Sequence, residues 1–143
     1  MQHRGWLAVA LIVIAASAVP TGQEKAASVA AAWVREPGPG ETSAPAFLTI
    51  DNPGMYELWI VSAATDAAKA VELREARPDD PSEIRTVKEL NVPAYGKLDM
   101  GDLGARLMLV GLTRPLKAGE HVMLTLKTDG SATLKVDALV RSR

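Results

Sequence analysis

Hydrophobic and polar positions alternate most clearly in the last third of the chain. Apolar side chains occupy every second position in residues 121–127 and again in residues 134–140. A period of two is typical of strands that bury one face and expose the other. Asp129 and Gly130 stand between the two segments, and this pair is typical of a tight hairpin turn. The sequence therefore predicts a β-hairpin at this end of the chain.

Upstream of this hairpin, short apolar runs alternate with turn-forming residues. Proline and glycine predict loops over residues 36–43 and 77–82, because neither residue sustains a strand ladder. We also expect a loop over residues 63–70, and no window shows the period of a long helix. The predicted strands cover residues 29–35, 46–51, 57–63, 70–75, 83–92 (with a break inside), 97–100 and 105–112. About eight or nine short strands at this spacing predict an all-β domain, a sandwich or a barrel.

The first 28 residues have the composition of an export segment. A short basic stretch precedes an apolar run over residues 6–18, which ends in the cleavage pattern Ala-Ser-Ala. This run is shorter than the roughly 20 residues that a membrane-spanning helix needs. We therefore predict a cleaved signal peptide over residues 1–18, a polar leader over 19–28 and one domain over 29–143. A periplasmic or secreted protein with no stable membrane anchor after cleavage is expected.

Composition and charge exclude several classes of function. The chain has no cysteine, so it has no disulfide, no thiolate metal site and no cysteine for lipid attachment. A formal net charge of −1 gives no basic excess for a nucleic-acid partner. His121 is the single histidine after the predicted signal, and no G-x-S-x-G motif accompanies it. Asp79 and Asp80 lie in a proline-rich loop, where solvated charge is the simplest interpretation. We predict that the protein is not an enzyme.

Several sequence blocks, in a fixed order, resemble the periplasmic copper chaperone family PCu(A)C, or PCuAC. These blocks are Val29–Arg35 with Trp33, Ala46–Gly54 (AFLTIDNPG), Val71–Arg74 (VELR), Ile84–Val87 (IRTV), Asn91–Gly96 (NVPAYG), Arg106–Leu112 (RLMLVGL) and Leu112–Leu126 (LTRPLKAGEHVMLTL). The resemblance spans residues 29–140. It implies a cupredoxin-like, immunoglobulin-like antiparallel β-sandwich. It also implies delivery of Cu(I) in the periplasm, with a partner protein in cytochrome oxidase assembly.

The resemblance also implies four metal-ligand positions, and this chain has replaced three of them. The family has His or Met after V-E-L, Met in M-R-x-V, and both ends of H-x-M. These PCuAC ligand positions are here Arg74, Ile84, Arg106 and Met108. Cu(I) prefers thioether and imidazole donors, whereas arginine stays protonated and isoleucine has no donor atom. Met108 is the retained ligand, so we expect Cu(I) binding to be weak, altered or lost.

A second pair of soft donors occurs in His121-Val122-Met123, where positions i and i+2 share one strand face. We favour the interpretation that Met123 is a packing residue and that His121 is exposed at the start of a strand. If strands 105–112 and 121–127 pair as a hairpin, Met108 lies opposite Thr125 and not opposite His121. That pairing weakens the case for a three-ligand site.

The two arginines at ligand positions suggest a different ligand chemistry. If the strand ends that meet at copper in the family also meet here, Arg74 and Arg106 lie together. Two guanidinium groups suit a carboxylate or phosphate, so an anion or an acidic partner is one hypothesis. Local pairing with Glu72 or Glu75 is the simpler interpretation. Three functions remain open: a copper chaperone-family protein with altered binding, a non-metal binding or assembly module, and a structural exported domain.

Overall fold

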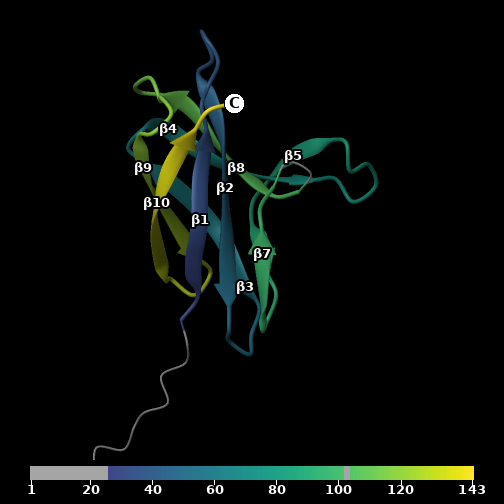
Figure 1. Cartoon of the computed structure of the whole chain (residues 1–143). Coiled ribbons are helices and arrows are strands. Elements are labelled where there is room, and N and C mark those ends of the chain that lie inside the picture. The colour runs from purple at the N-terminus through teal and green to yellow at the C-terminus, as the bar shows by residue number, and fades with distance from the viewer. Residues whose placement is uncertain (1–25, 102–103) are drawn as a thin grey trace, which may run out of the picture.

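The computed structural model describes residues 26–101 and 104–143, and every regular element in these ranges is a strand (Figure 1). The predicted signal peptide and most of the polar leader lie outside the described residues. The strands are β1 (Ser28–Arg35), β2 (Ser43–Asn52), β3 (Leu58–Thr65), β4 (Ala68–Ala76), β5 (Ile84–Val87), β6 (Leu90–Val92), β7 (Gly96–Asp99), β8 (Arg106–Leu112), β9 (His121–Thr128) and β10 (Thr133–Arg141). The predicted all-β fold is confirmed. In the described part of the chain no helix is long and apolar enough to span a bilayer.

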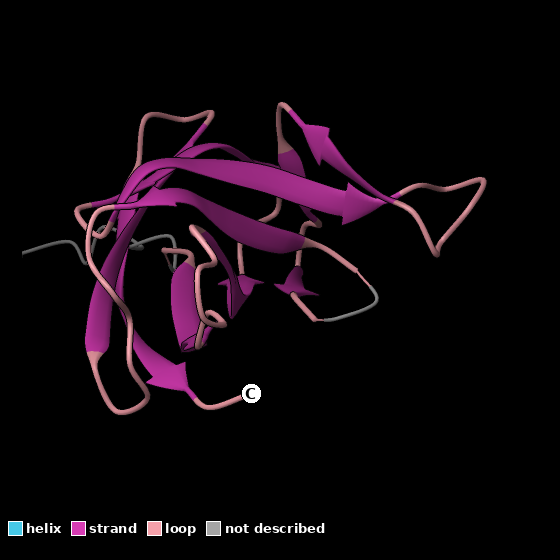
Figure 2. Ribbon diagram, turned by 90° about the horizontal axis from the view of Figure 1, so that it is seen from above, coloured by secondary structure: helices cyan, strands magenta, loops and turns pink. Residues whose placement is uncertain are grey.

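The strands form one strongly curved sheet that folds over as a barrel-like sandwich (Figure 2). Their order is β5-β4-β8-β2-β1-β10-β9-β3-β6, and β7 adds to β2. A further pairing of β3 with β4 brings distant members of this order together. β1 and β10 run parallel, whereas the other pairs among the described strands are antiparallel.

The inward side chains of the strands form one hydrophobic core. Val122, Leu124 and Leu126 of β9 are almost completely buried, as their alternation predicts. Leu107 and Leu109 of β8 pack into the same core. Burial of such side chains supplies the main driving force for folding. The outward positions of the same strands are therefore free to carry functional residues.

Three features of the prediction can be compared directly with the strands. The hairpin around Asp129 and Gly130 joins β9 to β10, as predicted. Segment 83–92 breaks into two strands, as predicted. The loop predicted over residues 63–70 is wrong, because β3 continues to Thr65 and β4 begins at Ala68. Small alanine side chains fit this tight reversal, and Ala67 donates its backbone N–H to the Thr65 hydroxyl at 3.3 Å.

The conditional pairing of residues 105–112 with 121–127 is also wrong. β8 pairs with β2 and β4, whereas β9 pairs with β3 and β10. The connection between β8 and β9 crosses from one part of the sheet to another instead of forming a hairpin. Met108 consequently lies opposite Pro45 and Glu72, and it has no register relation to β9.

A bulge in β1 decides which side chains face outward. The register on β2 shifts between Ala30 and Trp33, and Ala31 has a positive φ of 54°. The extra residue reverses the alternation, so that Val34 points to the core while Trp33 is turned to the outer face beside Phe47. Strict alternation from Val29 would have placed Trp33 inside. The bulge thus creates an aromatic pair on the outer face.

Candidate functional site: the outer face of the sheet

The two arginines at PCuAC ligand positions face each other on adjacent strands. Arg74 of β4 and Arg106 of β8 are direct partners in the antiparallel register. Residues opposite each other in such a pair extend to the same face of the sheet. Both side chains are half-buried. The structure therefore brings two guanidinium groups to the place where the sequence resemblance puts copper ligands.

Arg74 also forms the local ion pair that the sequence suggested. Its Nε and Nη2 atoms donate to Glu72 Oε2 at 3.1 and 2.7 Å. The Thr86 hydroxyl donates to the same carboxylate oxygen at 3.3 Å. The hydrogen bond from Arg74 holds the pKa of the Glu72 carboxyl below its usual range. The β4–β8 region thus carries an arginine–carboxylate pair on its outer face.

The other two PCuAC ligand positions lie on the same side of these strands. Met108 lies opposite Glu72 in the register, two residues from Arg106. Ile84 of β5 lies opposite Ala76, two residues from Arg74. Among the four side chains only the Met108 thioether has a lone pair suited to Cu(I). The register thus places the four positions on one face of β5, β4 and β8, with Met108 as the soft donor among them.

Beside Arg106, arginine and aromatic side chains pack together on the outer face. The ring centroids of Trp33 and Phe47 are 4.6 Å apart. Arg106 lies over the Phe47 ring at 5.9 Å and Arg141 over the Trp33 ring at 5.2 Å, while Arg35 contacts both rings at 5.4 and 6.0 Å. We call these five residues the arginine–aromatic cluster. Cation–π attraction and apolar contact both hold it together. Phe47 is only 1% exposed although it faces away from the core.

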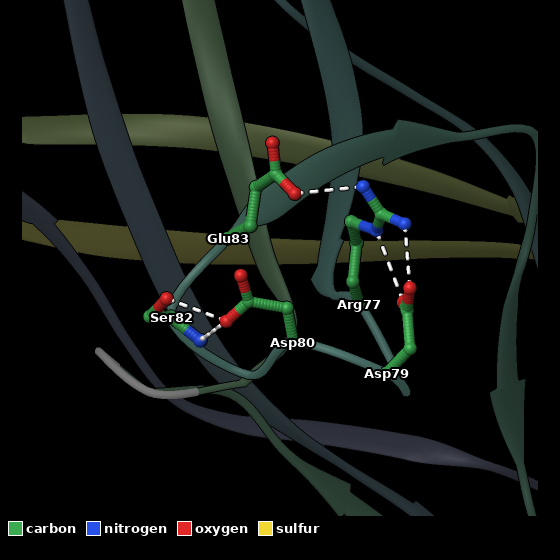
Figure 3. A network of polar contacts seen from close by, with 5 residues as sticks. All are labelled: Arg77, Asp79, Asp80, Ser82 and Glu83. Carbon is green, nitrogen blue, oxygen red and sulfur yellow. Dashed lines mark hydrogen bonds and ion pairs between the residues drawn. The ribbon is translucent and has the colours of Figure 1, made fainter.

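The β4–β5 loop is braced by its own charged residues (Figure 3). Arg77 donates to Asp79 at 2.6 and 3.1 Å and to Glu83 at 2.7 Å. The Ser82 hydroxyl donates to Asp80 at 2.6 Å. The hydrogen bonds from Arg77 hold the pKa of the Asp79 carboxyl below its usual range. The acidic pair in this loop therefore serves the shape of the hairpin that projects beside β5 in Figure 1.

His121 and Met123 have surroundings that sequence reasoning missed. Met123 is 48% exposed, so the interpretation of Met123 as a packing residue is wrong. Its outward position follows from the alternation of β9, whose inward residues are already Val122 and Leu124. Nδ1 of the exposed His121 lies 3.1 Å from Asp137 Oδ2 on β10. The hairpin register could have revealed this contact, because it places Asp137 opposite Met123, two residues along β9 from His121.

Carboxylate, histidine and cysteine side chains do not assemble into a group of three or more anywhere in residues 26–101 and 104–143. Hard cations such as Ca²⁺ are usually bound by several oxygen ligands, carboxylates above all. Methionine thioether and histidine imidazole are donors that select soft ions.

Comparison with known proteins gives three findings. Residues 27–140 match the family described as "Putative lipoprotein LpqE-like". A curated protein of Leifsonia xyli subsp. xyli, described as a putative lipoprotein, is 32% identical over 124 residues, which cover 83% of this chain and 72% of that protein. The solution structure of Cu(I)-bound DR1885 from Deinococcus radiodurans is 33% identical, with a TM-score of 0.71 over 84% of this chain and 81% of that one.

A further solved structure shares the fold at lower identity. The copper-bound PCuAC domain of PmoF2 is 18% identical, with a TM-score of 0.72 over 82% of this chain and 93% of that domain. The sequence-based expectation of a PCuAC-like β-sandwich is thus confirmed at the level of the fold. With its match over residues 27–140 and its similarity to the curated relative, the chain belongs to the LpqE-like family, on a fold that it shares with PCuAC copper domains.

Proposed function

We propose that this protein handles Cu(I) in the cell envelope, with weaker binding than the PCuAC domains it resembles. The observation that carries this proposal is its 33% identity, over most of both chains, to a protein whose structure holds Cu(I). Cu(I) is cargo that the protein binds and passes on, and the exchange partner is a protein of the envelope. By the sequence resemblance, cytochrome oxidase assembly is the process it serves.

Export is part of the same proposal. The predicted signal over residues 1–18 and the lipoprotein descriptions of the family and of the curated relative support an envelope location. These 143 residues contain no cysteine that could carry a lipid. We infer that the chain works in the periplasm or outside the cell.

The charges at the PCuAC ligand positions are the reason to expect weaker binding. Arg74 and Arg106 are direct cross-strand partners, so an incoming cation would meet two guanidinium groups. Glu72 offsets part of that charge, since it receives two hydrogen bonds from Arg74. Met108 alone offers one thioether, and Cu(I) needs at least one more soft donor for tight binding. Two arginines and a single thioether at these positions therefore favour weak Cu(I) binding.

A competition titration tests this function. The full chain and DR1885 are titrated anaerobically with Cu(I) against the same chromophoric Cu(I) chelator. We expect this protein to bind Cu(I) at least about tenfold more weakly than DR1885, a difference of about 1.4 kcal/mol. Equal affinities would contradict the loss of donors at the PCuAC ligand positions. Absence of any Cu(I) binding would contradict copper handling itself.

One observation favours a second candidate function, a docking face for an acidic segment of a partner protein. Arg74 and Arg106 are cross-strand partners. Arg106 also contacts the Phe47 ring, and Arg35 and Arg141 contact the same aromatic pair. Several guanidinium groups on one face suit the planar carboxylates of such a segment.

Binding of a glutamate-rich peptide, followed by NMR, tests the docking face. The double variant R74A/R106A should lose most of the affinity, and added salt should weaken binding to the unmodified protein. Arg114, in the loop after β8 and paired with Glu120 at 3.0 Å, provides the matched control R114A. Unchanged affinity in R74A/R106A would contradict the docking face.

A further inference from the structure

The outer face of the β9–β10 hairpin carries two soft donors in one place. His121 and Met123 stand two residues apart on β9, so both side chains extend to the same face. Val122 between them is buried in the core, which fixes the direction of both neighbours. Met123 is 48% exposed, so its thioether is accessible from solvent.

Asp137 orients the histidine. In the β9–β10 register Asp137 lies directly opposite Met123, and its Oδ2 lies 3.1 Å from His121 Nδ1. A carboxylate accepts a hydrogen bond, so the proton of this contact resides on Nδ1. In the tautomer that carries this proton on Nδ1, Nε2 has a lone pair for a ligand. Carboxylates hold metal-binding histidines in this manner.

The charges around His121 oppose a cation less than the Arg74–Arg106 pair does. The carboxylate of Asp137 is in direct contact with the histidine. Arg114 donates to the His121 backbone oxygen at 3.5 Å, and its own charge is paired with Glu120 at 3.0 Å. A cation that approaches His121 thus meets a carboxylate and a compensated guanidinium group.

The Met123 side chain is open to solvent on its other flank as well. Met123 borders a shallow depression of about 290 Å³ between β3 and β9. Its other lining residues are Ala64, Thr65, Asp66 and Thr125. The depression lies on the Thr125 side of Met123, so the thioether is bordered there by open space and not by packed side chains.

We propose that His121 Nε2 and Met123 Sδ form a Cu(I) site on the outer face of β9, with Asp137 as the positioning residue. This inference rests on the proposed function, because it names the site that holds the cargo. It differs in place from the PCuAC ligand positions, which lie on β4, β5 and β8, because β9 pairs with β3 and β10 and with none of those strands. Imidazole and thioether are the donors that Cu(I) selects. Two donors give a readily exchanged ion, which suits transfer to a partner.

Methionine-methyl NMR of the full chain during anaerobic Cu(I) titration locates the metal directly. We expect the Met123 methyl signal and the His121 ring signals to shift together and to saturate at one equivalent. Met108 and the exposed Met55 of the β2–β3 turn serve as internal references and should stay in place.

Matched variants give the corresponding affinities. Met123→Leu and His121→Gln should each weaken Cu(I) binding at least about tenfold, whereas Met108→Leu and Met55→Leu should change it less than about twofold. Asp137→Asn, which keeps the shape of the side chain, should weaken binding by a smaller factor. All five positions are at least half-exposed or lie outside the core, and unchanged NMR spectra of the metal-free variants verify folding.

The outcomes separate this site from the proposed function. If Cu(I) binds but shifts Met108 and not Met123, the β9 site is overturned while copper handling stands. If no methionine methyl shifts and no Cu(I) is retained, both are overturned. Saturating shifts at Met123 and His121, lost in the two variants, support both.

Discussion

Two parts of the outer face, the β4–β8 strand pair and the β9–β10 hairpin, carry different side-chain chemistry on one scaffold. The first has the PCuAC ligand positions but presents Arg74 and Arg106 as cross-strand partners. The second has no counterpart among those positions but presents His121 and Met123 beside Asp137. Where copper is expected by resemblance two arginines are cross-strand partners, and where it is not expected soft donors are exposed.

The difference shows that the fold of a β-sandwich depends little on which residues its strands present outward. Every second residue of a strand points away from the core, so donors can be replaced there without disturbing inward leucines and valines. Leu107 between Arg106 and Met108 is fully buried and keeps β8 in place. Similarity of fold therefore predicts the backbone of this chain, whereas its binding chemistry has to be established residue by residue.

Removal of the Phe47 ring should have the largest effect, a loss of folding stability. Phe47 is 1% exposed beneath Trp33 and the arginines of the arginine–aromatic cluster. Phe47→Ala should lower the free energy of unfolding by about 3–5 kcal/mol, measured by urea denaturation. Phe47→Leu, the control, should cost clearly less. A loss below about 1 kcal/mol for Phe47→Ala would show that the cluster is not a packed unit.

Restoration of donors at the PCuAC ligand positions should have the next largest effect. The triple variant R74H/I84M/R106H provides soft donors around Met108 and removes both guanidinium charges. We expect Cu(I) affinity to rise by roughly a hundredfold, or about 2.8 kcal/mol, in a competition titration. The variant R74Q/R106Q removes the charge without adding soft donors and should gain much less. An equal gain in both variants would mean that repulsion alone, and not the missing donors, limits binding.

The bulge that turns Trp33 outward allows a smaller test. Ala31 has a φ of 54°, a conformation that costs an L-residue energy and glycine very little. Ala31→Gly should therefore leave the protein equally stable or raise its free energy of unfolding by up to about 0.5–1 kcal/mol, although glycine usually weakens a strand. Ala30→Gly is the matched control and should be destabilising. Destabilisation of the same size by both changes would contradict strain at Ala31.

The smallest of the four expected effects is that acid removes the stability contributed by the Glu72–Arg74 pair of β4. The pKa of Glu72 is lowered in the folded protein by its hydrogen bond from Arg74. A lowered folded-state pKa contributes stability above the unfolded value of 4.5, and this contribution is lost as pH falls through the folded pKa. The pH dependence of stability below 4.5 should therefore be shallower in Glu72→Gln, measured by urea denaturation at several pH values. Carboxyl NMR should show the Glu72 pKa rising in Arg74→Gln. A Glu72 pKa that stays the same in that variant would show that Arg74 is not its cause.

Sequence reasoning succeeded where local patterns determine the structure. Alternation in residues 121–127 and the turn at Asp129 and Gly130 predict β9, β10 and their pairing. It failed where long-range register decides. Nothing in the run of alanines before Trp33 announces a bulge, and the pairing partners of β8 depend on the closure of the whole sheet.

The same distinction applies to the candidate sites. The meeting of Arg74 and Arg106 was suggested by resemblance, because related scaffolds bring the same strand positions together, and the register agrees with it. The contact of His121 with Asp137 requires the exact alignment of β9 on β10. Without that alignment Met123 has the appearance of a packing residue, although half of its side chain is exposed.

The copper bound per chain, with and without Met108→Ala, tests most directly whether the PCuAC ligand positions have lost their metal. The protein is loaded anaerobically with excess Cu(I), passed through a desalting column and assayed for metal and protein. We predict less than one copper per chain after the column and the same value for the variant. One tightly held copper per chain that disappears with Met108→Ala would contradict the loss of the metal from these positions.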